Sequence, residues 1–174
     1  MIRNKSVILG LLILLTITIL TSCAGTDMRP EKALKYFTEQ IEQGNLRDIS
    51  LKIYYVSPDI LTLHPLSVED LLRGHPIVID GTRLEEHIDL LKQMTNAALI
   101  PVEHESRINA RYYYVFETKK GNKIFDVAMW GDDSSMYVNG VEFKENNIFY
   151  DVLMPFVPED AAEELKNQAS QGQT

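Results

Sequence analysis

The chain contains four histidines, the residues most often used for metal binding and proton transfer near neutral pH. No two of them are four residues apart, and no HExxH-type spacing occurs. His87 follows Glu85 and Glu86 beside an apolar stripe, which favours a partly exposed helix histidine over a zinc ligand, because zinc needs three or four converging ligands. The pair His104 and Glu105 would need a nearby nucleophile or water to act as a general base. We therefore expect no metal and no catalytic residue at the histidines, which are His64, His75, His87 and His104.

A second polar cluster, Gly131-Asp132-Asp133-Ser134-Ser135, lies between two expected strands. Adjacent carboxylates and hydroxyls suit a hard cation such as calcium, but calcium loops alternate their ligands and end in a bidentate acid. A turn explains the glycine, aspartates and serines equally well. The sequence also lacks nucleotide-binding, P-loop and nucleophile-elbow motifs. We expect no cofactor. An envelope hydrolase that uses a histidine and acids in an unfamiliar arrangement stays open as an alternative.

The aromatic residues form the most distinctive group. Tyr112, Tyr113 and Tyr114 are consecutive, so on a strand the middle tyrosine faces the opposite side from its neighbours. Arg111 and Trp130 are expected to be cross-strand neighbours on the face of Tyr113. Aromatic and cationic side chains together suit a peptide or a sugar. Arg111, Tyr113 and Trp130 are therefore a candidate ligand face. The alternative is that a helix covers them and they belong to the core.

A β-hairpin over residues 111–130 must position this group. Its turn falls at Lys119-Lys120-Gly121-Asn122, and one face is entirely apolar or aromatic, which specifies the register. The expected pairs on that face are Phe116 with Phe125, Tyr114 with Val127, and Tyr112 with Met129. On the other face they are Glu117 with Ile124, Val115 with Asp126, and Arg111 with Trp130.

Further strands are expected on both sides of this hairpin. Asn139-Gly140 between two β-rich runs is the strongest short hairpin signal. Residues 49–56 alternate in polarity as a half-buried strand does. The remaining strand candidates are residues 77–79, 99–102, 135–138, 141–144 and 148–153.

Amphipathic helices precede most of these strands. Pro30 suits the first turn of a helix whose apolar face includes Phe37 and Ile41, and Ser67 with Asp70 forms a capping box for a short helix. Thr82 with Glu85 predicts a second capping box and a helix to about residue 98, and residues 159–166 predict a final helical turn or two. The order of elements predicts an α+β fold, with amphipathic helices packed on one face of a curved antiparallel sheet built from sequential hairpins.

The N-terminus combines charge, an apolar run and a cysteine. Arg3 and Lys5 precede the apolar residues 7–20, which is the pattern of an export signal. The tetrapeptide Leu20-Thr21-Ser22-Cys23 resembles the lipobox of bacterial lipoproteins. The resemblance implies a diacylglyceryl group on the Cys23 sulfur and cleavage between Ser22 and Cys23. The alternative is an uncleaved membrane helix, although the apolar run is shorter than the ~18 to 20 residues that a span requires. Both topologies place the following domain outside the cell.

Processing would divide the chain into a signal peptide (1–22), a lipidated tether (23–29), one α+β domain (30–167) and a disordered tail (168–174). The domain resembles small Gram-positive lipoproteins in general type, a likeness that implies no site residues. The net charge is −8, and loss of Arg3 and Lys5 lowers it to −8 − 2 = −10, which argues against nucleic acid as a partner. Cys23 is the only cysteine, so no internal disulfide forms.

These observations lead to one functional expectation. The chain is expected to be a non-enzymatic binding or interaction module, anchored to the outer face of the cell membrane through the lipid on Cys23. Its expected ligand is an envelope protein, a peptide or a glycan. The alternatives are the hydrolase and a structural assembly subunit.

Overall fold

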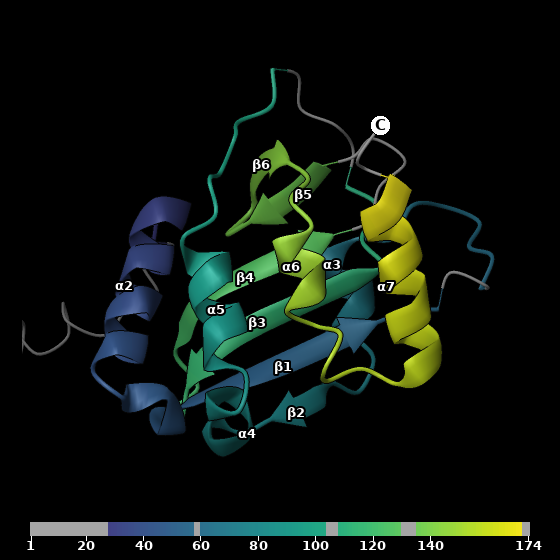
Figure 1. The fold of residues 1–174 in the computed structure, drawn as a ribbon. Coiled ribbons are helices and arrows are strands. Elements are labelled where there is room, and N and C mark those ends of the chain that lie inside the picture. Colours follow the sequence, from purple (N-terminus) through teal and green to yellow (C-terminus); the bar gives the residue numbers. More distant parts are fainter. Residues whose placement is uncertain (1–27, 58–59, 104–107, 130–134, 172–174) are drawn as a thin grey trace, which may run out of the picture.

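The computed structural model describes residues 28–57, 60–103, 108–129 and 135–171. Its centre is a six-stranded antiparallel sheet with the strand order β2-β1-β3-β4-β5-β6 (Figure 1). The strands are β1 (Ile49–Tyr55), β2 (Ile77–Ile79), β3 (Tyr112–Thr118), β4 (Lys123–Met129), β5 (Ser135–Val138) and β6 (Val141–Lys144). From β3 to β6 each strand pairs with the next one along the chain.

Helices cover one face of this sheet, so the fold is α+β, as the sequence predicts. In Figure 1 helices α2, α5, α6 and α7 lie in front of the sheet, and α3 lies behind it. The helical elements are α2 (Pro30–Glu42), the 3₁₀ helix η1 (Asn45–Asp48), α3 (Val68–Leu71), α4 (Gly81–Glu85), α5 (Ile88–Thr95), α6 (Ile148–Asp151) and α7 (Glu159–Gln171).

The main core lies between the sheet and the helices in front of it. Side chains at alternate positions of β3 point into this core, as strand geometry requires. Phe116 packs against Phe37 of α2 with 4.6 Å between ring centroids, and against Phe125 of β4 at 4.9 Å. Tyr114 is fully buried, and its hydroxyl donates a 3.2 Å hydrogen bond to the Phe149 carbonyl of α6. Through these contacts α2, β4 and α6 pack against the centre of β3.

A second, smaller cluster lies on the opposite face of the sheet. It contains Tyr113, Val115 and Ala128, with Leu71 of α3 packed over them. The segment around α3 is held to the sheet by backbone hydrogen bonds, including the Ala110 amide to the Leu66 carbonyl at 2.9 Å. This face is therefore covered by a short connecting segment rather than by a long helix.

The predicted hairpin register is confirmed from Tyr112 to Phe116, while the predicted pair of Arg111 with Trp130 lies outside the described residues. All three apolar pairs form, and Val115 lies opposite Asp126. Glu117, however, lies opposite Lys123, because a β-bulge follows Phe116. The predicted pairing of Glu117 with Ile124 is therefore wrong. The bulge lets the apolar Ile124 join the buried core, while Lys123 faces the polar side.

Two predicted strands do not form. Residues 99–102 contribute only an isolated bridge between Pro101 and Phe143. Residues 148–153 contain α6 instead of a strand. The buried residues there are Phe149, Tyr150, Val152 and Leu153, a spacing of one, three and four residues that fits one side of a helical turn.

The helix predicted from residue 82 to 98 is split into α4 and α5 around Glu86 and His87. The predicted capping box of Thr82 with Glu85 is wrong, because the N-cap is Asp80, whose carboxylate accepts a 3.0 Å hydrogen bond from the Arg83 amide. Glu85 instead bonds Arg47 at 3.1 Å. The capping box of Ser67 and Asp70 is confirmed, as is the helix that begins at Pro30. Helix α7 continues to Gln171, beyond the predicted end at Lys166.

Gly81, the first residue of α4, packs directly on η1. A methyl group at its Cα would overlap the Leu46 carbonyl oxygen and lie 2.5 Å from Arg47 Cα. Both neighbours are backbone atoms, so neither can move without shifting the chain. We expect Gly81→Ala to lower the free energy of unfolding by about 3 kcal/mol in urea titrations, the upper range for overpacking. Thr82→Ala, next in sequence and exposed, is the control and should change it by less than about 0.5 kcal/mol. Equal effects of the two substitutions would contradict this account.

Candidate functional site

Two of the three residues of the predicted ligand face lie beneath other parts of the chain. Arg111 is 9% exposed and Tyr113 is 8% exposed. Trp130 lies outside the described residues, as do Ser22 and Cys23. The segment that carries α3 covers the sheet at this point. Tyr113 still borders a small recess, described below, whereas Arg111 lies beneath the loop that it binds. The ligand face stays a prediction.

Arg111 holds the loop between β1 and α3. Its Nη1 donates to the Ile60 carbonyl at 3.1 Å, and its Nη2 donates to Thr62 Oγ1 at 3.3 Å. Its Nε is buried, and no acceptor for it occurs in the part of the chain that the structure describes. Arginine keeps its charge in proteins. The buried guanidinium of Arg111 is therefore stabilised by hydrogen bonds to two neutral oxygens of the loop. Arg111 therefore fixes the loop to the sheet.

Tyr113 takes part in a polar cluster at the edge of the same face. Burial raises the pKa of the Tyr113 phenol, and the nearby Asp126 carboxylate, its hydrogen-bond partner, raises it further. Asp126 also accepts a 2.8 Å bond from Lys123 Nζ. A recess of about 220 Å³ lies beside this cluster, with Tyr137 and Gly140 among its lining residues. The phenol stays a neutral donor at physiological pH, which suits a structural role.

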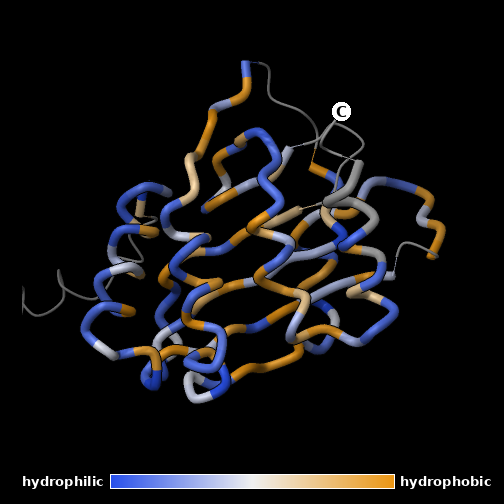
Figure 2. Tube along the Cα trace, in the orientation of Figure 1, coloured by the Kyte–Doolittle hydropathy of each residue, from blue (hydrophilic) through white to orange (hydrophobic). Residues whose placement is uncertain are grey.

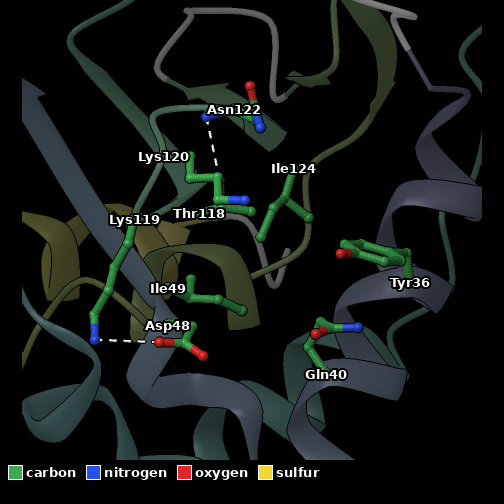
Figure 3. Close-up of a pocket in the computed structure, with 9 residues that line it drawn as sticks. All are labelled: Tyr36, Gln40, Asp48, Ile49, Thr118, Lys119, Lys120, Asn122 and Ile124. Atoms are coloured by element: carbon green, nitrogen blue, oxygen red, sulfur yellow. Dashed lines mark hydrogen bonds and ion pairs between the residues drawn. The ribbon is translucent and has the colours of Figure 1, made fainter.

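A larger open depression lies between α2 and the β3–β4 turn (Figure 3). We call it the turn groove, and its volume is about 530 Å³. Side chains from α2 form one wall, while η1 and the start of β1 form its floor, and the β3–β4 turn forms the other wall. The lining residues are Tyr36, Gln40, Asp48, Ile49, Thr118, Lys119, Lys120, Asn122 and Ile124.

The wall at the β3–β4 turn is built by the backbone. Gly121 has φ +80°, a left-handed conformation that glycine adopts without strain. The Thr118 amide donates to the Asn122 carbonyl at 2.9 Å and closes the turn. The Lys119 amide then donates to the Asp48 carbonyl at 2.8 Å, and its Nζ lies 3.2 Å from the Asp48 carboxylate. The turn is thus tied to η1, which fixes the width of the groove.

The groove offers hydrogen-bonding groups next to an aromatic ring. Figure 3 shows the Tyr36 side chain extending from α2 across the groove toward Ile124. Gln40 uses its Oε1 to accept a 3.2 Å bond from Asn45. The side-chain amide nitrogen of Gln40 has no hydrogen-bond partner among the residues that the structure describes. Lys120 is exposed and pairs with no carboxylate of the residues that the structure places. Together these groups suit a polar ligand that is neutral or negatively charged.

Sequence reasoning did not identify this groove. Tyr36 and Gln40 occupy the side of α2 next to its buried face, and the sequence predicts only a turn at residues 119–122. The one available signal was charge, because three lysines fall within residues 119–123 of an acidic chain. This cluster of lysines indicates the wall that the β3–β4 turn forms, but it does not indicate that α2 forms the opposite wall.

The other candidate residues do not converge. His64 and His75 are exposed, and His87 packs edge-on against Phe156 at 5.0 Å between ring centroids. His104, Glu105 and residues 131–134 lie outside the described part. Within that part, no three histidine, cysteine or acidic residues are grouped as a metal site would require. The same residues include no helix with the length and apolar character to cross a bilayer.

The role of Arg111 can be tested by substitution. Arg111→Ala removes the two donors that hold Ile60 and Thr62, so we expect faster chymotrypsin cleavage at Leu61 and Leu63, by about tenfold. Loss of charged hydrogen bonds and packing should also lower the unfolding free energy by about 2 kcal/mol. The control is Arg73→Ala, because Arg73 is highly exposed and pairs only with Asp70 in the described structure. Unchanged cleavage in Arg111→Ala would show that the loop does not depend on this side chain.

Comparisons with known proteins add no family assignment. No family model matches the chain, and the searches of curated proteins and of solved structures found no match either. Functional inference therefore depends on the residues and on the geometry described above.

Proposed function

We propose that this protein is a non-enzymatic binding module on the outer face of a bacterial cell membrane, anchored through a lipid on Cys23, and that the turn groove binds an anionic glycan of the cell envelope. The observation that carries the ligand proposal is the combination in one groove of an aromatic ring, two side-chain amides and a lysine that pairs with no carboxylate of the described residues. The anchor proposal depends on the lipobox-like residues.

The start of the domain suits a short anchor. The Met28 carbonyl accepts a 2.7 Å hydrogen bond from Asn139 Nδ2, and Asn139 itself has φ +49° in the β5–β6 turn. The described fold therefore begins at Met28. Five peptide steps separate Met28 from Cys23, which limits the tether to roughly 18 Å when fully extended. A lipid on Cys23 would keep the domain close to the bilayer surface.

The position of the groove favours a glycan over a peptide that pairs as a strand. The groove lies at the turn between β3 and β4, where β3 pairs with β1 as far as Thr118. Its walls are formed by α2 and by this turn, whereas a peptide that adds as a strand binds along the backbone edge of a sheet. Recognition must use side chains instead. The Tyr36 ring, the Gln40 and Asn122 amides and the Lys120 ammonium suit the hydroxyl and carboxylate groups of an acidic sugar.

The anchor can be tested in a bacterial host that processes lipoproteins. Metabolic labelling with a radioactive fatty acid should label the wild-type protein, and Cys23→Ala should abolish the label. The same substitution should prevent cleavage before residue 23, which mass spectrometry of the N-terminus would detect. Thr26→Ala, in the tether, is the control and should leave labelling unchanged. Retained label in Cys23→Ala would contradict the anchor.

The groove can be tested by titrating isotope-labelled protein with soluble cell-wall glycan fragments that carry carboxylates. We expect NMR shift changes centred on Lys120, Asn122 and Gln40, and affinity that falls as salt is added. Lys120→Glu should weaken binding about tenfold and leave the melting temperature within about 2 °C, because the side chain is exposed. Lys92→Glu makes the same charge change on α5 as a control. Tighter binding of an acidic peptide of equal charge, or an equal effect of both variants, would overturn the glycan assignment.

A further inference from the structure

The loop between β1 and α3 exposes large apolar side chains. Leu61 is 95% exposed, Leu63 is fully exposed and Ile60 is about half exposed. Figure 2 shows this stretch as an apolar segment outside the body of the fold. Residues 60–66 contain no acidic residue, lysine or arginine, in a chain with a net charge of −8. Isolated exposed apolar residues are common, but a group on one loop indicates a contact surface.

Hydrogen bonds hold this loop in place. Buried Arg111 binds the Ile60 carbonyl and Thr62 Oγ1. At the far end, the Leu66 amide donates to Asn109 Oδ1 at 3.1 Å and the Leu66 carbonyl accepts from the Ala110 amide. Because the polar side chain of Thr62 turns inward to Arg111, its neighbours Leu61 and Leu63 face outward. The apolar side chains are thus presented by a fixed scaffold.

The short length of the tether suggests what covers this loop. In Figure 1 the loop leaves the end of β1 on the side of the sheet away from α2. The tether reaches the fold at the β5–β6 turn, where Asn139 holds Met28. With at most roughly 18 Å between Cys23 and Met28, the bilayer is the apolar phase that is always near the domain. A protein partner would have to be recruited separately.

We propose that Leu61 and Leu63 insert into the bilayer that carries the lipid on Cys23, which gives the domain a second membrane contact and a fixed orientation. This inference rests on the lipid anchor of the proposed function. Insertion removes two exposed leucine side chains from water, which is favourable in proportion to their apolar area. The tether alone would leave the domain free to rotate.

The test uses the full-length lipidated protein in phosphatidylcholine vesicles. The lipid blocks the Cys23 sulfur, so a cysteine introduced by Leu61→Cys is the only thiol for an environment-sensitive fluorophore. We expect spin-labelled lipids to quench a probe at position 61 at least threefold more strongly than a probe placed by Ile100→Cys. Ile100 is a suitable control because it is also an exposed apolar residue, 52% exposed, and it lies in another connection. A third probe, attached after Leu63→Cys, should also be quenched more strongly than the probe at position 100.

Four outcomes separate the two proposals. Flotation of the wild-type protein with vesicles and selective quenching at positions 61 and 63 would support both. Flotation with equal quenching at positions 61 and 100 would overturn the insertion and leave the anchor standing. Failure of the protein from the lipoprotein-processing host to float would overturn the anchor, and the insertion with it. Shielding of position 61 from both lipid quenchers and aqueous iodide would identify a protein partner and overturn the bilayer as the occupant.

Discussion

Aromatic packing between α2 and the central strands determines the position of the turn groove and of the point where the tether enters the fold. Phe37 lies 4.6 Å from Phe116 and 5.3 Å from Phe125, measured between ring centroids, so a single side chain of α2 contacts both β3 and β4. Because α2 is fixed by this contact, Tyr36 and Gln40 are fixed at the wall of the turn groove. The beginning of the same helix leads back to Met28, where the tether starts. One cluster of rings therefore determines both the width of the groove and the place where the tether enters the fold.

The two faces of the sheet are stabilised in different ways. The face toward the helices carries a continuous apolar core, whose stability comes from area removed from water. The opposite face is covered by a short segment that includes α3, and its polar groups are paired locally, as in Lys52 with Glu117 and Tyr113 with Asp126. The hydrogen bond to Glu117 raises the pKa of Lys52, so the Lys52 side chain remains charged at neutral pH. The covered part of this face is smaller and more polar than the core, so its covering loop depends on the Arg111 hydrogen bonds.

Local patterns predicted those parts of the fold in which neighbours in the sequence are neighbours in space. The pairs of β3 with β4, the turn at Asn139 and the start of α2 follow from alternation, turn chemistry and the proline at the first helical position. Features set by distant contacts could not be predicted in this way. The cap at Asp80 depends on the packing of Gly81 against Leu46, which is 35 residues earlier in the chain. The turn groove has the same origin, because its walls come from α2 and from a turn about 80 residues later.

The proposed membrane contact and the turn groove use separate parts of the structure. The loop of Leu61 and Leu63 depends on Arg111, which immediately precedes β3, whereas the groove adjoins Thr118 at the other end of the same strand. A seven-residue strand separates these ends by roughly 20 Å. A rigid sheet strand therefore keeps the groove and the loop at a fixed separation within the domain. In this arrangement the tether supplies attachment, the loop supplies orientation and the groove supplies recognition. Each depends on different side chains, so substitutions in one should leave the other two intact.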